Sequence, residues 1–202
     1  MAVKLLVATH NQGKVDELTE LLAELDVEWL SLHDVGITES VAETGTTLRE
    51  NAILKARTYA RATGMLTLAD DTGLEVDALG GQPGVHTARY GGEGLTPPER
   101  YTVLLENMDD VPEESRTARF RTVVALATPA ELVGTAEGVV EGQIAREPSG
   151  EHGFGYDPVF IVAERGETMA ELPASVKNRI SHRGRAMAAI APLLRQQLAA
   201  AP

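Results

Sequence analysis

The 202-residue chain contains no cysteine. It can therefore form no disulfide, offer no thiol nucleophile and build no thiolate metal site, so any metal must be held by oxygen or histidine ligands. The lack of cysteine also favours a reducing compartment. The first residues show no cationic start followed by a long apolar stretch, and the chain lacks the run of about 18 apolar residues that spans a membrane. These absences predict a cytoplasmic protein without a membrane partner.

Positive charge is also scarce. The chain has 18 Lys and Arg residues against 30 Asp and Glu residues, which gives a formal net charge of −12. Long nucleic acids and anionic membranes bind to broad positive surfaces, so neither is expected as a partner. A small anion that brings its own metal is compatible with this charge. The lysines are only Lys4, Lys14, Lys55 and Lys177, and three of them lie in the motifs described below.

Apolar periodicity, capping residues and glycines predict alternating strands and helices. Thr47 with Glu50 and Thr96 with Glu99 have the form of helix caps, Gly64 should end the first of these helices, and Asn51 and Lys55 share one face of it. Residues 117–128 and 132–145 should pair as antiparallel strands. The expected strands span residues 3–8, 27–32, 65–69, 117–128, 132–145 and 158–162, and the expected helices span 13–25, 47–62, 96 onward and 181–198. Pro192 should kink or interrupt the last helix, and the acid-rich residues 106–114 should form a solvated connection. This order predicts an α/β protein with a mixed twisted sheet and flanking helices. We expect one domain over residues 1–202, with two lobes around a central substrate cleft.

A polar motif follows the first expected strand and leads into an amphipathic stretch. It consists of Thr9, His10, Asn11, Gln12, Gly13 and Lys14. A strand-to-helix turn of this kind points free N–H groups and one ammonium at an anion, as a phosphate site requires. It is not a Walker A motif, because Ala8 replaces the first glycine and Val15 replaces the Ser or Thr that binds metal. An ordinary structural turn is the alternative interpretation.

A second polar segment, Asp70-Asp71-Thr72-Gly73, follows a short apolar strand. Two adjacent carboxylates at a strand end can hold a hard divalent cation or take a proton from water. Asp-Thr-Gly is also the turn of aspartic proteases, in which two aspartates share a proton, so this chain with its single copy would need a homodimer. A polar turn without function is the third interpretation. Upstream, Glu43 either adds a carboxylate near a helix N-terminus or is a simple loop acid.

Basic residues gather near the end of the chain. Residues 177–185 contain four of the 18 Lys and Arg residues and no acid. His182 and Arg183, at an expected helix start, could donate hydrogen bonds to a carbonyl oxygen of a ligand. The simpler alternative is a solvated basic helix end.

An aromatic pair lies in a glycine-rich run of a chain in which only 4% of residues are aromatic. The run contains Phe154, Gly155, Tyr156 and Asp157. Two rings beside glycines could form a flat stacking surface for a base. The alternative is that both rings pack in the core.

Several motifs occur in one order along the chain. They are Ala-Thr-His-Asn-Gln-Gly-Lys at 8–14, Glu-Thr-Gly at 43–45, Glu-Asn-Ala-Ile-Leu-Lys-Ala at 50–56, Ala-Asp-Asp-Thr-Gly-Leu at 69–74, Leu-Gly-Gly-Gln-Pro-Gly at 79–84, Ala-Arg-Tyr at 88–90, Gly-Phe-Gly-Tyr-Asp-Pro at 153–158 and Ile-Ser-His-Arg-Gly at 180–184. In order and spacing they closely resemble the inosine/xanthosine triphosphate pyrophosphatase family. The resemblance covers nearly the whole chain.

The resemblance implies a homodimeric, Mg²⁺-dependent enzyme that cleaves ITP, dITP and XTP between the α- and β-phosphates. Its products would be the nucleoside monophosphate and pyrophosphate. By the family pattern, Thr9 to Lys14 would hold phosphates, Glu43 and Asp71 would bind the metal, and Asp71 would also accept the proton of the attacking water. Thr72 would touch the substrate. The nucleoside and base pocket would be formed by Phe154, Gly155, Tyr156, Asp157, Lys177, His182 and Arg183.

A 6-oxo purine presents a hydrogen-bond acceptor where adenine presents an amino donor, so a pocket lined with donors would reject adenine. The chain departs from the family pattern near the expected phosphate and metal sites, where Thr72 replaces a frequent serine. His10 stands where many relatives have glycine, and Ala42 stands where some have a second glutamate, which leaves one fewer carboxylate near the metal. A nucleotide-binding module without catalysis is the remaining alternative function.

Overall fold

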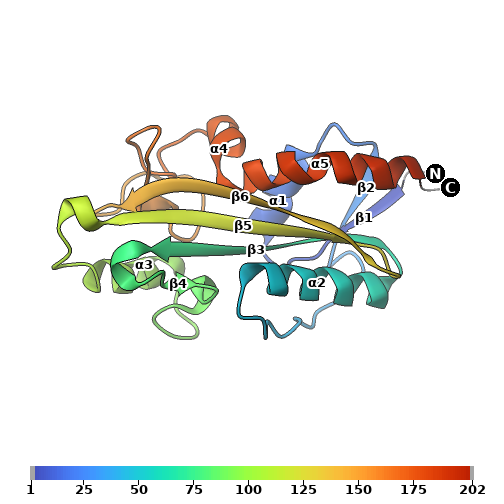
Figure 1. Cartoon of the computed structure of the whole chain (residues 1–202), viewed down its shortest axis with the longest axis horizontal. Coiled ribbons are helices and arrows are strands. Elements are labelled where there is room, and N and C mark those ends of the chain that lie inside the picture. Colours follow the sequence, from blue (N-terminus) through green and yellow to red (C-terminus); the bar gives the residue numbers. More distant parts are fainter. Residues whose placement is uncertain (1–2, 201–202) are drawn as a thin grey trace. The chain divides into compact units, whose positions relative to one another are not determined.

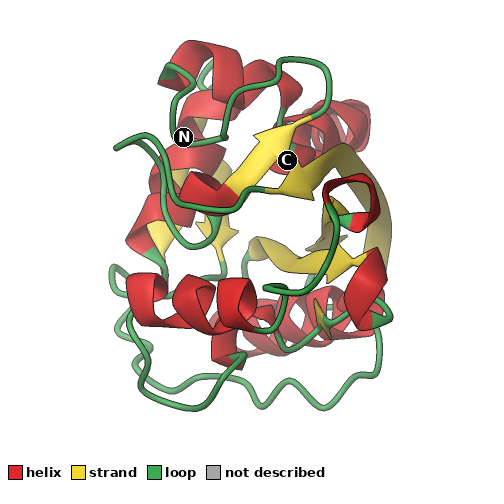
Figure 2. Ribbon diagram, turned by 90° about the vertical axis from the view of Figure 1, so that its left-hand side faces the viewer, coloured by secondary structure: helices red, strands yellow, loops and turns green. Residues whose placement is uncertain are grey.

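The protein has an α/β fold with a mixed sheet, seen in a computed structural model that describes residues 3–200. The strands are β1 (Val3–Val7), β2 (Val27–Ser31), β3 (Leu66–Val76), β4 (Pro83–Gly84), β5 (Thr117–Ala127), β6 (Leu132–Ile144) and β7 (Phe160–Val162). The helices are α1 (Gln12–Leu21), α2 (Leu48–Thr63), α3 (Pro97–Glu106), α4 (Ala174–Ile180) and α5 (His182–Ala200). Helices flank the strands (Figures 1 and 2). The expected fold class is confirmed.

The sheet combines parallel and antiparallel pairs. Its strand order is β2-β1-β3-β5-β6-β7, with β4 paired to β3. β1 runs parallel to β2 and to β3, whereas β3–β4 and β6–β7 are antiparallel. β5 and β6 are neighbours joined by only four residues, a connection that suits an antiparallel pair. The expected pairing of these two strands is thus confirmed.

The chain forms two compact units. Unit 1 comprises residues 1–71, 122–138 and 183–202, and unit 2 comprises residues 72–121 and 139–182. β3, β5 and β6 each contribute residues to both units, and each unit has an apolar core of its own. The expectation of one domain over residues 1–202 stays a prediction.

Unit 1 is built on parallel pairing of β1 with both of its neighbours. α1 and α5 lie on one face of these strands, and α2 lies on the other (Figure 1). The core beneath α1 and α5 joins strand residues such as Leu5 and Leu68 to Leu18 of α1 and Ile190 of α5. α2 packs through a face of small residues that includes Ala52, Ala56 and Ala60.

Local sequence accounts for α2. At its start, the hydroxyl of Thr47 accepts a hydrogen bond from the Glu50 N–H, and the Glu50 carboxylate accepts one from the Thr47 N–H. This reciprocal cap satisfies two donors that the helix itself leaves unpaired. At its end, Gly64 adopts a left-handed conformation with φ of 73°, which glycine reaches without steric cost. The expected bounds of this helix are confirmed to within two residues.

Two other helices differ from expectation. α1 ends at Leu21 rather than at residue 25, because the next residues form a tight turn in which the Leu25 N–H donates to the Leu22 carbonyl. α5 continues through Pro192, so the expected interruption is wrong. Proline removes the donor for the carbonyl four residues earlier, and that residue, Ala188, is exposed, so water can satisfy its carbonyl.

The most consequential difference concerns β3. The sequence predicts a strand at residues 65–69 that ends before Asp70, whereas the strand runs without interruption from Leu66 to Val76. Val7 of β1 pairs with Leu68, and β4 pairs with the strand beyond the acids through Leu74. Pairing on both sides of the acidic pair keeps it in extended conformation. The polar segment is therefore part of a strand and not a turn.

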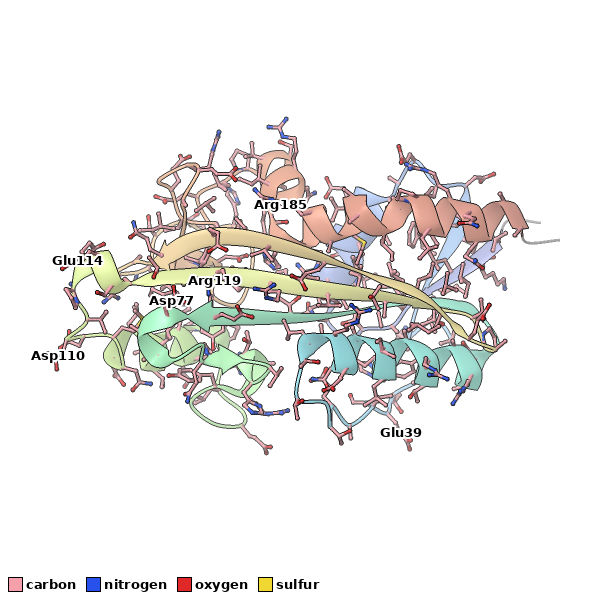
Figure 3. All side chains as sticks on the ribbon, viewed as in Figure 1. Glu39, Asp77, Asp110, Glu114, Arg119 and Arg185 are labelled. Carbon is pink, nitrogen blue, oxygen red and sulfur yellow. The ribbon has the colours of Figure 1, made fainter. Side chains whose placement is uncertain are left out.

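Unit 2 has a core that contains Leu74 of β3, Leu104 of α3, Phe120 of β5 and Phe160 of β7. α3 begins with the expected reciprocal cap between Thr96 and Glu99. The acid-rich residues after α3 are exposed, as expected; Asp110 and Glu114 project outward in Figure 3. α4, which carries Lys177, was not predicted from the sequence.

A buried arginine, Arg116, links backbone segments within unit 2. Arg116 is 1% exposed, and its guanidinium donates to the backbone carbonyls of Met108, Ile144 and Ala145. On the surface, Arg119 of β5 forms a two-bond contact with Asp77 (Figure 3), at 3.0 Å for each bond. Both arginines are occupied by structural contacts.

Candidate active site

Asp70 and Asp71 are consecutive residues of β3, and their side chains leave the strand on opposite faces. Successive side chains of a strand alternate in this way. Asp70 contacts Lys14 of α1 and Arg183 of α5, whereas Asp71 contacts Lys55 of α2. Those helices cover opposite faces of the strands of unit 1 (Figure 1). The two adjacent carboxylates therefore have different direct partners, and the expectation that they hold one divalent cation stays a prediction.

The Asp70 side is a closed group of ion pairs. Lys14 Nζ lies 2.8 Å from Asp70 Oδ2, and Arg183 Nη2 lies 3.6 Å from the same oxygen. Arg183 also donates to the carboxylate of Glu17 in α1. Burial by itself would raise the pKa of Asp70, but the positive charges of Lys14, Arg183 and, to a smaller extent, Lys55 outweigh it and lower that pKa well below the usual range. Asp70 is thus a fixed negative charge that orients Lys14 and Arg183.

The expected phosphate loop connects β1 to α1. Its residues hold one another: the Thr9 hydroxyl accepts from the Asn11 N–H at 3.2 Å, and the Asn11 side chain caps α1 by accepting from the Lys14 N–H at 3.2 Å. His10 Nε2 lies 3.4 Å from the Glu39 carbonyl.

The remaining loop residues start the helix. Gln12 donates to Asp16 at 2.8 Å, and Gly13 occupies the second position of α1. The loop therefore presents a helix N-terminus with the Lys14 ammonium in the same unit, an arrangement that favours an anion.

The Asp71 side brings a second acid and one cation together. Lys55 Nζ lies 2.9 Å from Asp71 Oδ1 and 2.7 Å from Glu43 Oε1. Asn51, one helical turn before Lys55, donates to Asp71 Oδ2 at 3.3 Å. The expectation that Asn51 and Lys55 share one face of the helix is thereby confirmed. Glu43 contacts Lys55, the eighth residue of α2, and the expectation that its carboxylate lies near the N-terminus of this helix stays a prediction.

Opposing influences set the charges on this side. Burial raises the pKa of Asp71, and the charge of Glu43 adds to that rise, so together they outweigh the lowering effect of Lys55. Burial by itself would lower the pKa of Lys55. The charges of Asp71 and Asp70 and the hydrogen bond to Glu43 outweigh this effect, so the pKa of Lys55 is raised. The group therefore contains a charged ammonium beside a carboxyl that accepts a proton more readily than an ordinary aspartate does.

The loop that carries Glu43 is fastened to the start of α2. The Gly45 N–H donates to Asn51 Oδ1 at 2.8 Å, and the Thr46 N–H donates to Glu50 Oε2 at 2.7 Å. A Cβ at Gly45 would lie 2.6 Å from Asn51 Oδ1, so only glycine allows this approach. The side-chain amide of Asn51 thus links the Glu43 loop to Asp71, because its oxygen accepts from the loop and its nitrogen donates to Asp71.

The donor set suits a magnesium ion that shares a phosphate ligand. Within residues 3–200, no three His, Cys, Asp or Glu side chains assemble as a complete metal site. Mg²⁺ is usually bound by one or two carboxylates together with substrate phosphates rather than by a full protein cage. Glu43 and Asp71 supply two carboxylates around one cation, which fits that requirement.

A second cluster lies in unit 2. Lys177 Nζ of α4 lies 2.8 Å from Asp157 Oδ2, and the same oxygen accepts from the Phe154 N–H at 2.9 Å. The ammonium also lies 4.8 Å from the centre of the Phe154 ring, a contact typical of a cation–π interaction. A Cβ at Gly153 would lie 2.1 Å from Asp157 Oδ2, so the glycine lets the backbone approach this pair.

The expected aromatic pair has two separate roles. Tyr156 is 4% exposed, belongs to the apolar core and donates from its hydroxyl to the Thr87 carbonyl at 3.1 Å. Core packing is the correct interpretation for this ring. Phe154 and Gly155 are half-buried, and the Phe154 ring faces Lys177.

Three basic side chains near the end of the chain are buried and do not form a solvated helix end, whereas Arg179 is exposed. Lys177, His182 and Arg183 are 4%, 4% and 2% exposed. The His182 ring stacks on Phe120, with centroids 4.6 Å apart and planes inclined by 20°. Thr72, the next residue of β3 after Asp71, is half-buried.

Sequence reasoning missed three residues of these clusters. The sequence places Lys55 and Asn51 on one helix face but indicates no role for them, and it gives no signal for Glu17. The rarity of lysine and the four-residue spacing from Asn51 to Lys55 could have indicated the first two. No local pattern links Glu17 to Arg183, which is 166 positions away.

No helix within the described part of the chain is both long enough and apolar enough to cross a membrane.

Comparisons with known proteins agree on one family. The model of the Ham1 family matches residues 5–193. The dITP/XTP pyrophosphatase of Bacillus subtilis is 48% identical over 94% of this chain and 96% of its own length. The dITP/XTP pyrophosphatase of Shigella flexneri is 47% identical over 95% of this chain and 98% of its own length.

Solved structures resemble the whole chain as well. A HAM1 protein from Coxiella burnetii superposes with a TM-score of 0.87 at 40% identity and covers 96% of this chain and 99% of its own. A nucleoside-triphosphatase or dITP/XTP pyrophosphatase from Mycobacterium abscessus has a TM-score of 0.76 at 44% identity, over 94% of this chain and 100% of its own.

Proposed function

Because the chain belongs to the Ham1 family, we propose that it hydrolyses the non-standard purine nucleoside triphosphates dITP, ITP and XTP to the nucleoside monophosphate and pyrophosphate. Relatives named dITP/XTP pyrophosphatase match it at 46–51% identity over nearly its full length. The observation that carries the proposal is the group around Asp71, in which a carboxyl with a raised pKa lies beside a second acid and a buried ammonium.

Asp71 is the proposed catalytic residue. A water molecule attacks the α-phosphorus and gives its proton to the Asp71 carboxylate, while the bond to the oxygen that bridges to the β-phosphorus breaks and pyrophosphate leaves. A raised pKa suits this role, because a general base works best when its pKa is close to the working pH.

Magnesium is the proposed cofactor, held by Glu43 and Asp71 together with the triphosphate. When bound, it would neutralise negative charge on the phosphate oxygens, which is the main electrostatic demand of phosphoryl transfer. The protein's own contribution is to hold the two carboxylates in place through β3, Asn51 and the start of α2.

The triphosphate is assigned to residues 9–14 of unit 1. The N-terminus of α1 offers backbone donors, and Lys14 offers an ammonium that Asp70 orients. Thr72 is assigned to contact the substrate beside Asp71. These groups recognise charge and carry no information about the base.

Base recognition is assigned to Phe154 to Asp157, Lys177, His182 and Arg183. Lys177 and Arg183 can only donate hydrogen bonds, and His182 donates from at least one ring nitrogen. A 6-oxo group accepts from such donors, whereas the 6-amino group of adenine would leave a buried donor unpaired. The ring of Phe154 supplies an aromatic face.

The alternative functions differ in their support. The aspartic protease interpretation needs Asp71-Thr72-Gly73 to form a turn with its aspartate facing a second copy. Here the segment lies inside β3, and Asp71 is paired with Lys55. A nucleotide-binding module without catalysis would bind ITP and release no product.

The test is to incubate the protein with ITP, XTP, GTP and ATP, with and without Mg²⁺, and to identify products by chromatography. We expect IMP and pyrophosphate from ITP, little product from GTP and ATP, and no turnover in EDTA. Accumulation of IDP and phosphate would contradict the site of cleavage. Binding of ITP without product in the presence of Mg²⁺ would favour the binding module.

Two further properties belong to the proposal. We expect a homodimer, as the family resemblance implies, which light scattering on the purified chain would test. We also expect the enzyme to act on free nucleotides in the cytoplasm, which localisation of a tagged chain would test.

A further inference from the structure

Lys55 holds together the two acids that are assigned to the metal. Its Nζ lies 2.7 Å from Glu43 Oε1 and 2.9 Å from Asp71 Oδ1. The side chains of Lys55 and Asp71 are only 13% and 10% exposed, so water screens the charges poorly. Glu43 and Asp71 repel each other, as the influence of Glu43 on the pKa of Asp71 shows. Two carboxylates in this setting need a cation between them.

Asp71 and the backbone of the Glu43 loop are anchored independently of Lys55. Asp71 is part of β3 and accepts a hydrogen bond from Asn51. Glu43 belongs to a loop whose backbone is bonded to Asn51 and Glu50. Lys55, in contrast, reaches both acids through a flexible four-carbon chain. Asp71 and the backbone beside Glu43 therefore keep their places without Lys55, and the ammonium can move away from both acids.

We propose that the Lys55 ammonium is a positioning group that occupies the place of the metal between Glu43 and Asp71 in the nucleotide-free protein, and that the metal has to displace it. The inference rests on the proposed function, which assigns the two acids to a metal. Mg²⁺ binds oxygen at about 2.0–2.1 Å, closer than the 2.7 and 2.9 Å of the ammonium contacts. Two cations beside the same oxygens would repel each other, so one replaces the other.

The exchange has two consequences for the protein without nucleotide. Lys55 relieves the repulsion between the acids when metal is absent, and thereby stabilises the metal-free fold. The same contact competes with the metal, so it lowers metal affinity. Removing Lys55 should therefore tighten metal binding, although the residue lies directly at the site. A lysine with a merely structural role would produce the opposite result or none.

The experiment uses the full chain without nucleotide and measures Mg²⁺ binding by isothermal titration calorimetry. In Lys55→Met, which keeps an unbranched side chain one atom shorter and removes the charge, we expect affinity to increase at least about tenfold, a common size for coupling between ligands. The melting temperature of this variant should fall in EDTA and rise more with Mg²⁺ than that of the wild type. The matched control is Lys4→Met, which removes a surface ammonium that pairs with the exposed Glu28 and should leave Mg²⁺ affinity within about twofold.

Equal or weaker Mg²⁺ binding by Lys55→Met would overturn the proposal. If that variant is unfolded in EDTA, Mg²⁺ should restore its helical circular dichroism signal, and failure to restore it would overturn the proposal as well. Glu43→Gln should weaken Mg²⁺ binding, both as a single variant and in combination with Lys55→Met. Tight Mg²⁺ binding by the double variant would place the ion at another site and would also overturn the proposal. ITP hydrolysis by the wild type is assayed separately, so a failed exchange with normal hydrolysis rejects this inference alone.

Discussion

The two faces of β3 each carry an aspartate, at adjacent positions, but the charged groups around these two aspartates differ. On one face, Asp70 is the acid that two cations share, because Lys14 and Arg183 both approach its Oδ2. On the other, Asp71 and Glu43 are two acids that share one cation, Lys55. Excess positive charge lowers the pKa of Asp70, whereas burial and a neighbouring acid raise that of Asp71.

The difference gives a structural role to Asp70 and a chemical role to Asp71, although both belong to one strand. A carboxylate with a lowered pKa, locked between cations, is a poor proton acceptor and a good anchor. A carboxyl with a raised pKa and a neighbouring acid is suited to bind a metal and to accept a proton. Strand geometry alone places these two roles one residue apart, because consecutive side chains face opposite ways.

The largest effect is expected from Asp70→Asn, which removes the charge that holds Lys14 and Arg183. Loss of one partner from a buried ion pair costs about 3–5 kcal/mol, and urea unfolding should show a loss of this size. Asp71→Asn is the matched control and should lose less, because burial already disfavours the charge of Asp71. Equal losses in the two variants would remove the distinction between the faces.

Asp71→Asn should instead abolish activity. It keeps the shape of the side chain but removes the proposed base and a metal ligand, so kcat for ITP should fall by at least about 10²-fold, the scale of a positioned general base. Circular dichroism should show an intact fold. Near-normal turnover would move the catalytic role to Glu43 or to Asp70.

A third comparison separates base choice from phosphate binding. His182→Ala removes a proposed donor to the 6-oxo oxygen, an interaction worth about 1–3 kcal/mol. The ratio of kcat/KM for ITP to that for ATP should fall roughly 10- to 100-fold. In Lys14→Ala that ratio should stay nearly constant, because an ammonium on a phosphate does not read the base. An unchanged ratio in both variants would assign base selection to Phe154 to Asp157.

The smallest effect is a pair of titration shifts. Carbon-13 carboxyl NMR in EDTA should show Asp71 taking up a proton at a pH above that of an ordinary aspartate, since burial raises its pKa. Asp70 should remain ionised at a pH where ordinary aspartates protonate, since its cations lower its pKa. Spectra of Asp70→Asn and Asp71→Asn assign the two signals. Shifts in the same direction would contradict the electrostatic difference between the two faces.

Helix α2 shows how far local reasoning reaches. The Thr47–Glu50 cap, the stop at Gly64 and the shared face of Asn51 and Lys55 were all predicted correctly. These features depend on residues at most four positions apart or on one glycine, so the sequence displays them directly. The same is true of the cap at the start of α3.

The acidic pair in β3 shows where such reasoning fails. Asp, Asp, Thr and Gly have turn propensities, so the segment was expected to end a strand. Pairing with β1 before the acids and with β4 after them keeps the chain extended. The buried Arg183 is likewise open to a solvated interpretation from the sequence, because its partner Glu17 is distant in sequence.

The sequence by itself determined the capped helices, the α/β class and, through the order of its motifs, the family. Those features arise from short-range hydrogen bonds and from hydrophobic periodicity. Only the tertiary structure decided that Asp70 and Asp71 face different helices and that Lys55 joins Glu43 to Asp71. The physical reason is that the charge state of a buried acid depends on desolvation and on cations brought from distant elements, and no local run of residues contains that information.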